Sequence, residues 1–481
     1  MVNGLDNNQI IALIVNFSVL LVSLGVSIFL IFKIKFDDKN YRLLFIIYTL
    51  YWIAPMLLRE YTSQMQAAMK GIGDAAANGV FWWLPVTIYG IIGLFWKPLN
   101  DLLSHRLKSR KTVIYISIFI QAAGAIPMIA YPCFATNVIQ SLTVGIGASG
   151  IAVFSLMFNE QYAKRKVFLT VSLLSLPPLL GEFFSSVLQC CVTSFLPPKP
   201  QPVITPEYWS QYIPIVKYMW VIGLFFIVTT GILTIFIKEK KAFLYQDNQY
   251  KEPVKNKYDI WVVVLLIFAA ATTSFVKFST SGGDIITELT NIGQHYGMET
   301  KAYEGYLSVI FTVGQMAANI VTGLFLVKKM SKWTIFTISS GLWLLFGVLY
   351  GSLPNVWSRM ACNILNGWAF GTTYNIIVGI TLNKFFTKSN KITPITLYNT
   401  GLSIGICSSL FFKQFLNKDV FHEGKLDWDV YLVRNWIVAG IVIGIILLMW
   451  VSFTTAWFIE KKHPPKRIRV NRVRNQQDMD D

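Results

Sequence analysis

The stretch KEKKAFLYQDNQYKEPVKNK, from Lys238 to Lys257, decides the fold of this chain. It contains six lysines and separates two series of six apolar segments, and one further apolar segment precedes the first series. Each segment has roughly 20 residues, which is enough to cross the ~30 Å hydrocarbon layer of a bilayer as a helix. The sequence therefore predicts an all-α polytopic membrane protein with 6+6 transmembrane helices in two pseudo-symmetric bundles and one extra N-terminal helix.

Composition agrees with this class, since 54% of the residues are apolar and only 14% are charged. The predicted spans are 9–33, 42–60, 77–97, 111–131, 136–158, 166–196, 211–237, 258–280, 305–327, 332–352, 356–378, 391–416 and 434–460. The predicted organisation is an extra helix in 1–38, a first bundle in 39–237, a basic linker in 238–257, a second bundle in 258–460 and a basic tail in 461–481.

The positions of the cations predict the orientation of the chain. Of the 42 Lys and Arg residues, 31 fall in alternate connections and in the tail, which is the positive-inside pattern. We therefore expect a multi-pass protein of the cell membrane, with the N-terminus outside and the C-terminus in the cytoplasm. Because these cations follow the topology, the net charge of +17 does not indicate a nucleic-acid partner. We expect lipid and a small-molecule solute as partners, and a monomer.

The sequence lacks motifs that are typical of several other functional classes. The sequence contains no Walker loop and no H-E-x-x-H, its G-x-G-x-x-G match at Gly145–Gly150 lies inside a predicted span, and no soluble segment is large enough to hold a nucleotide. The four histidines lie outside the predicted spans, and the five cysteines have no C-x-x-C spacing. We thus expect no cofactor, no metal site and no enzyme, with a membrane enzyme or a non-transporting receptor as the remote alternative.

Ionisable residues inside spans are costly, so each is a candidate functional residue. Arg59 and Lys277 lie at nearly matching depth in the first helix of each predicted half, where two converging cations would bind a doubly charged anion such as a phosphate. The alternative is that both side chains extend to the lipid headgroups, with Glu60 as the local partner of Arg59. Glu182, in the middle of its span, is a candidate for proton or cation coupling together with Glu60, although it could equally bond serines on its own helix.

Other polar and aromatic residues would line a solute path. Tyr374 and Asn375, in the stretch from Thr372, and Tyr398 and Asn399, in the stretch from Thr396, bring hydroxyl and amide groups into apolar helices. Simple hydrogen bonds between helices are the alternative for these four residues.

The arrangement from about 40 to 460 resembles the major facilitator superfamily. The signature of that superfamily, G-x-x-x-D-[RK]-x-G-[RK]-[RK], is matched loosely between Lys97 and Lys111, with Asp101 and a basic cluster in place but Lys97 at the first glycine. The resemblance implies that Asp101 pairs with an arginine such as Arg110 in a gate that breaks when the halves rock.

A narrower similarity links the chain to the organophosphate:phosphate antiporters, the glycerol-3-phosphate and hexose-phosphate exchangers. The segments around Arg59 and Lys277 resemble the two arginine positions of that branch, and Tyr89 its site tyrosine. Leu176-Pro-Pro-Leu-Leu180 resembles its Pro-Pro pair. The second cation is lysine, and the family's fifth-helix histidine falls on Thr170.

These observations predict a secondary transporter that moves a small polar solute by alternating access. Within this class they favour a phosphorylated organic anion exchanged for phosphate, bound by Arg59 and Lys277, with Tyr89, Tyr48 and Trp52 lining the first half. The alternative is a proton- or cation-coupled importer of a neutral or cationic nutrient that uses Glu182 or Glu60.

Overall fold

The computed structural model describes residues 6–33, 39–161, 167–197, 205–239, 257–280, 289, 292–293, 295–298, 300–384, 394–416, 421–422 and 425–463. Most of the basic linker, the tail after His463 and the basic connections at 162–166 and 385–393 lie outside the described residues.

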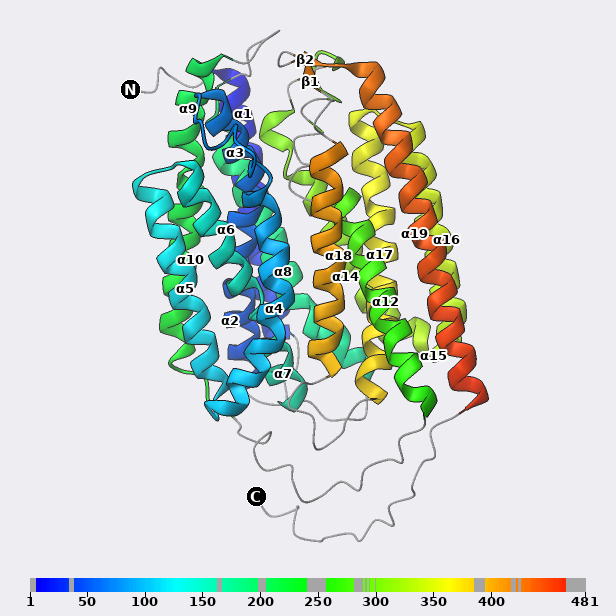
Figure 1. Ribbon diagram of the computed structural model, residues 1–481. Helices are drawn as coiled ribbons and strands as arrows, with labels where there is room; N and C mark the ends of the chain where they lie inside the picture. Colours follow the sequence, from blue (N-terminus) through cyan, green and yellow to red (C-terminus); the bar gives the residue numbers. More distant parts are fainter. Residues whose placement is uncertain are drawn as a thin grey trace.

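The helices stand side by side as two bundles (Figure 1). The first contains α1(Asn7–Lys33), α2(Lys39–Glu60), α3(Thr62–Gly71), α4(Leu84–Arg106), α5(Arg110–Ala130), α6(Phe134–Ala148), α7(Ile151–Gln161), α8(Val167–Thr193), α9(Pro206–Val216) and α10(Tyr218–Thr234). The second contains α12(Lys257–Thr280), η2(Lys301–Tyr303), α14(Tyr306–Val321), η3(Thr322–Leu326), α15(Val327–Lys329), α16(Lys332–Ser352), α17(Val356–Lys384), α18(Pro394–Leu416), the hairpin β1(Phe421–His422)–β2(Lys425–Leu426) and α19(Trp428–Lys462).

The number of helices that qualify as membrane spans is lower than predicted. Among the described residues, ten segments are long and apolar enough to cross a membrane, instead of thirteen. The predicted spans 77–97, 356–378 and 391–416 are not among the ten, although α4, α17 and α18 occupy these regions. These helices contain buried polar side chains such as Lys97, Asn366 and Asn399, which make them less apolar than their neighbours. The full arrangement of twelve helices plus one stays a prediction.

Helix boundaries depart from the predicted spans where the chain contains proline or glycine. Residues 74–83 form turns, so α4 begins at Leu84 and extends to Arg106, beyond the predicted end at 97. The segment 136–158 is divided into α6 and α7 at Ser149–Gly150. Helix α9 begins with Pro206 after Thr205, whose side chain accepts a hydrogen bond from the backbone N–H of Tyr208, as an N-cap does.

The turn between α4 and α5 is short and fixed by local chemistry. Lys108 has a left-handed backbone (φ 53°), which reverses the chain direction. Ser109 then caps α5, because its side chain accepts a hydrogen bond from the backbone N–H of Thr112. The same turn is tied to the end of the first bundle, since the Ser109 hydroxyl donates to Glu239 (2.8 Å).

Two helix pairs make the most extensive contacts between the bundles. Helix α4 packs against α18, and α8 packs against α14. Close backbone approach characterises both pairs: a Cβ atom at Gly90 would lie 2.9 Å from the Cα of Cys407, and one at Gly305 would lie 2.5 Å from the carbonyl oxygen of Ser186. Small residues therefore permit close backbone contact between the bundles at both pairs.

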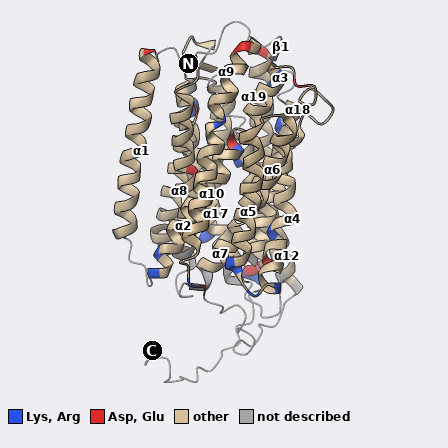
Figure 2. Ribbon diagram, turned by 90° about the vertical axis from the view of Figure 1, so that its left-hand side faces the viewer, with Lys and Arg blue, Asp and Glu red and all other residues tan. Residues whose placement is uncertain are grey.

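Helix α1 stands at the margin of the first bundle (Figure 2). It contacts α8 and η2, and most of its apolar side chains are exposed, as expected for a helix that faces lipid on most of its surface. Figure 2 also shows that the charged residues of the described chain gather at the ends of the bundle, with few near its middle.

Candidate functional site

A cavity lies between the two bundles, with about 820 Å³ of space between its lining atoms, part of which is open to solvent. Helices α2, α4, α6 and α8 contribute its wall from the first bundle, and α12, α14, α17 and α18 from the second. The polar and charged side chains in the wall are Arg59, Tyr89, Lys97, Ser149, Ser175, Glu182, Ser274, Lys277, Gln315, Tyr374, Asn399 and Ser403, and Trp52 also lines it.

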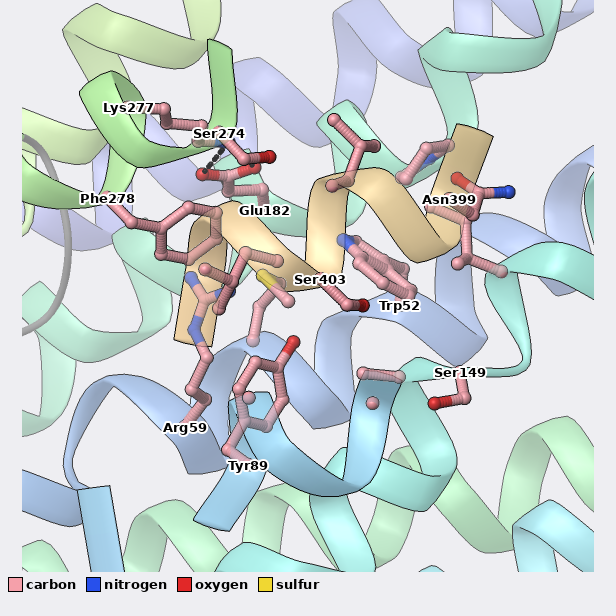
Figure 3. Close-up of a pocket in the computed structure, with 18 of the residues that line it drawn as sticks. Trp52, Arg59, Tyr89, Ser149, Glu182, Ser274, Lys277, Phe278, Asn399 and Ser403 are labelled. Carbon is pink, nitrogen blue, oxygen red and sulfur yellow. Dashed lines mark hydrogen bonds and ion pairs between the residues drawn. The ribbon is translucent and has the colours of Figure 1, made fainter. Parts of the chain in front are cut away.

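Arg59 lies in the last turn of α2, with its side chain 13% exposed. Its guanidinium forms an ion pair with Glu60. The Cζ atom of Arg59 lies 5.5 Å from the ring centre of Tyr89 and 5.0 Å from that of Phe278, so it has one aromatic contact in each bundle. These contacts leave Arg59 in the wall of the cavity (Figure 3).

Lys277 and Glu182 form an ion pair that links the two bundles. The ammonium of Lys277, on α12, lies 3.2 Å from both carboxylate oxygens of Glu182, on α8. Three phenylalanine rings surround the ammonium, with ring centres at 4.8 Å for Phe311, 5.1 Å for Phe370 and 5.7 Å for Phe278. The pair is buried on both sides, and Figure 3 shows it at the cavity.

A close helix contact positions Glu182. The preceding residue, Gly181, packs against α2: a Cβ atom there would lie 2.8 Å from the Cβ of Trp52 and 2.9 Å from the carbonyl oxygen of Thr49. Helix α8 can therefore approach α2 closely at this level. The hydroxyls of Ser185 and Ser186 donate to the backbone carbonyl of Glu182, while the carboxylate itself pairs with Lys277.

A third cation, Lys97, also lines the cavity. Its ammonium, on α4, donates hydrogen bonds to the Ser403 hydroxyl (2.7 Å) and to the backbone carbonyl of Asn399 (3.0 Å), both on α18. The residue is only 7% exposed. No carboxylate among the described residues forms an ion pair with Lys97.

The formal charges of the lining residues do not balance. Arg59, Lys97 and Lys277 are opposed by Glu182, which leaves an excess of two positive charges, or of one when Glu60 is included as the partner of Arg59. Buried charge without a counter-ion is unfavourable in a low-dielectric site. The site is therefore electrostatically suited to an anionic ligand.

Several predicted lining residues lie elsewhere. Tyr48 is fully buried in the first bundle, stacked on Phe154 with ring centres 4.7 Å apart, and does not line this cavity. Tyr398 is buried against Tyr374. The Asn375 amide donates to Ser172 on α8 (2.9 Å), a contact between helices and not a cavity position.

The predicted gate residues lie at the end of α4 and at the start of α5. Asp101 is fully buried, and its carboxylate accepts a hydrogen bond from the Thr396 hydroxyl on α18 (3.0 Å). The Arg110 side chain is buried as well, and its backbone N–H donates to Glu239. The structure thus places Asp101 at a contact between the bundles, while its pairing with Arg110 in a gate stays a prediction.

The sequence places Lys97 at the end of the predicted span 77–97 and at the start of a basic cluster, and neither feature identifies it as a cavity residue. Helical spacing carries the missed signal: Tyr89, Gly93 and Lys97 lie four residues apart and so share one face of α4. The sequence does not single out Ser403 and Phe278 either, since neither type of residue is unusual within a span.

Among the described residues, no group of His, Cys, Asp and Glu side chains could hold a metal ion.

Comparison with solved structures identifies the fold as that of the major facilitator superfamily. The human organic anion transporter MFSD10 (TETRAN) is similar with a TM-score of 0.55 and 11% identity over 87% of this chain and 100% of that chain. FucP, a major facilitator superfamily transporter in its outward conformation, gives a TM-score of 0.56 at 12% identity, over 87% and 98% of the two chains. A single-residue variant of FucP, the E. coli fucose:proton symporter, gives 0.54 at 12% identity with the same coverage.

No family model matches the sequence, and no curated protein matches it either. The structural similarity, at 11–12% identity, shows the fold of the chain.

Proposed function

We propose that this protein is a secondary active transporter that moves a small organic anion across the cell membrane by alternating access. The observation that carries the proposal is the excess of positive charge in a cavity walled by both bundles. A site at the interface of two repeated halves is reached from one side of the membrane and then from the other as the halves rock. An organic anion transporter is among the proteins that share this fold.

Within this class, we favour a phosphorylated organic anion that is exchanged for phosphate. The Arg59 guanidinium has a planar set of donors that suits two phosphate oxygens at once. Lys277 supplies a second cation from the other bundle, and both cations contact the same ring, that of Phe278. An anion that bound both would compete with Glu60 and Glu182 for these two cations.

Such competition suits a transporter, because it ties substrate binding to the contact between the bundles. The Glu182–Lys277 pair joins α8 to α12. When the anion replaces Glu182 as the partner of Lys277, the direct link between the bundles is replaced by a link through the substrate. The rocking motion can then carry the anion across without leaving a buried charge unpaired.

The same ion pair supports a second candidate, a proton-coupled importer of a neutral or cationic nutrient. Protonation of Glu182 would break its pairing with Lys277 and would bias the equilibrium between the two orientations of the bundles. Glu60 would act in the same way on Arg59. FucP, which has the same fold, is a fucose:proton symporter.

The charge distribution supports the proposed orientation. Lys33 ends α1, Lys39 begins α2, and Arg106 ends α4, so cations gather at one end of the bundle (Figure 2). We assign this end to the cytoplasm, which places the N-terminus outside and the C-terminus inside. We further propose that the chain works as a monomer, with residues 39–237 and 258–460 as its moving halves.

Phosphate counterflow tests the main proposal. Purified protein in liposomes loaded with unlabelled phosphate should accumulate labelled phosphate from outside, and sugar phosphates should compete. Arg59→Ala should abolish exchange, and Arg59→Lys should retain part of it because the charge remains without the planar fork. Arg106→Ala, at an exposed arginine at the end of α4, is the matched control and should exchange normally.

The outcomes separate the two candidates. Exchange that is unchanged in Arg59→Ala contradicts the anion site. The proton-coupled importer would be established by three results in a folded preparation. The protein would not exchange phosphate, a proton gradient would drive accumulation of a neutral solute, and Glu182→Gln would abolish that accumulation.

A further inference from the structure

Lys97 occupies an unusual chemical position in the cavity. The ammonium group has three N–H donors, and two of them reach neutral oxygens, the Ser403 hydroxyl and the Asn399 carbonyl. A buried cation that is bonded only to neutral groups recovers little of its lost hydration. The third donor bonds none of the described residues, and an anionic oxygen is the acceptor that stabilises a buried ammonium most.

A second donor beside Lys97 lacks a partner. The side-chain Nδ2 of Asn399 is buried and makes no hydrogen bond among the described residues, although Asn399 is only 3% exposed. It lines the same cavity, and in Figure 3 it lies on the side away from Arg59. A buried amide donor without a partner is costly, so its presence in the cavity wall indicates an absent acceptor.

Lys97 is well separated from the Arg59 end of the cavity. Arg59 contacts Tyr89, which lies eight residues before Lys97 on α4. Eight residues correspond to about 12 Å along a helix axis. Arg59 thus contacts α4 about two turns before the position of Lys97, so each cation suits an acidic group of its own.

We infer that Lys97, Asn399 and Ser403 form a second acidic-group subsite of the cavity, which binds a carboxylate or phosphate between α4 and α18. This inference rests on the proposed function. It adds that the transported solute has either two acidic groups, one for each subsite, or a single acidic group that occupies the two subsites in turn. The ligand chemistry is an oxyanion: Lys97 supplies the charge, Asn399 the amide donor, and Ser403 a hydroxyl.

The subsite also lies at a contact between the bundles. Lys97 belongs to the first bundle and Asn399 and Ser403 to the second, and the Asp101–Thr396 bond lies one turn further along the same two helices. An oxyanion here would be held by both bundles at once. Binding at this subsite is therefore coupled to the α4–α18 contact.

The number of bound phosphate ions per purified full-length chain tests the inference. Equilibrium dialysis with labelled phosphate, at constant ionic strength set by chloride, should give two sites in the unmodified protein. Lys97→Met should lose one of the two, and Arg59→Ala should lose the other. Lys97→Arg should restore two, whereas Lys217→Met, a lysine between α9 and α10 outside the cavity, should leave two.

A second variant covers the case in which Lys97→Met fails to fold. Asn399→Asp keeps the size of the side chain but places a carboxylate beside Lys97. This carboxylate should pair with the Lys97 ammonium and so reduce the number of bound phosphate ions by one. Acetate distinguishes the two ligand chemistries: if it displaces the phosphate that depends on Lys97, the subsite accepts carboxylates, and if it does not, the subsite is specific for phosphate.

The outcomes separate this inference from the proposed function. Suppose that the unmodified protein binds one phosphate, that Arg59→Ala removes it, and that neither Lys97→Met nor Asn399→Asp changes it. This result would overturn the second subsite and leave the transporter proposal standing. A folded, unmodified protein that neither binds nor exchanges phosphate would overturn both.

Discussion

The hydroxyl of Tyr306 donates a hydrogen bond to Oδ1 of Asn16 (2.9 Å), which joins α14 of the second bundle to the extra helix α1. The amide nitrogen of Asn16 lies 2.9 Å from the Ser194 hydroxyl beyond the end of α8 and 3.1 Å from the carbonyl oxygen of Ala302 in η2. Asn16 is fully buried in a helix whose other residues are mostly exposed. The extra helix is thus tied to both bundles through one polar residue.

Replacement of Asn16 by leucine should destabilise the protein. Leu cannot accept from Tyr306 or donate to Ser194 and Ala302, so the loss should be about 1–3 kcal/mol, given the modest strength of hydrogen bonds within membranes. Thermal unfolding in detergent measures the change. Ser18→Leu, at an exposed serine on the same helix, is the control and should not lower stability. Equal stability of the two variants would show that the Asn16 contacts contribute nothing.

The architecture was largely predictable because apolar length is a strong signal for a membrane helix. The structure places Arg59 and Lys277 in one cavity, since an ionisable residue in an apolar segment must face the protein interior. Their role in binding stays a prediction. Apolar length could not show that 136–158 divides into α6 and α7, because that break depends on backbone geometry at Ser149–Gly150.

Side-chain direction was the part that the sequence could not supply. Tyr48 and Tyr398 have the same polar hydroxyl as Tyr89, yet both pack inside a bundle while Tyr89 faces the cavity. Lys97 lies at the end of the predicted span 77–97, next to a basic cluster, and only the extension of α4 to Arg106 shows that it lies well inside the helix. Such assignments need the relative rotation of packed helices, which depends on contacts between distant segments.

The Glu182–Lys277 pair should show strong coupling in a double-mutant cycle. Glu182→Gln alone leaves the Lys277 ammonium buried without its counter-ion, and Lys277→Met alone does the same to the carboxylate, each at a cost of about 3–5 kcal/mol. The double variant should cost clearly less than the two single variants added together. Unfolding free energies of the four proteins test this, and simple additivity would show that the pair makes no net interaction.

The bond between Asp101 and Thr396 should keep the end of α4 closed against α18. Thr396→Val removes the hydroxyl that donates to the carboxylate, and a hydrogen bond to a charged group contributes about 1.5–3 kcal/mol. An engineered cysteine at the buried Ser104 should then react faster with a water-soluble thiol reagent. Thr400→Val is the matched control, because Thr400 bonds only within α18, to the carbonyl of Thr396. Equal labelling in both variants would contradict a closing role for the bond.

Gly367 should tolerate no larger residue, because α17 and α14 touch through it. A Cβ atom there would lie 2.0 Å from the carbonyl oxygen of Phe311, a backbone atom that cannot move without shifting α14. Since Phe311 and Phe370 surround the Lys277 ammonium, such a shift should disturb the cavity as well as the packing. We therefore expect Gly367→Ala to lower stability by about 1–3 kcal/mol, as overpacking does, and to reduce phosphate exchange. Gly341→Ala is the control, since nothing lies within 4 Å of its added Cβ and alanine favours the helix. If Gly367→Ala unfolds at the temperature of the unmodified protein and exchanges phosphate at the same rate, the close contact between α14 and α17 is not a constraint on the cavity.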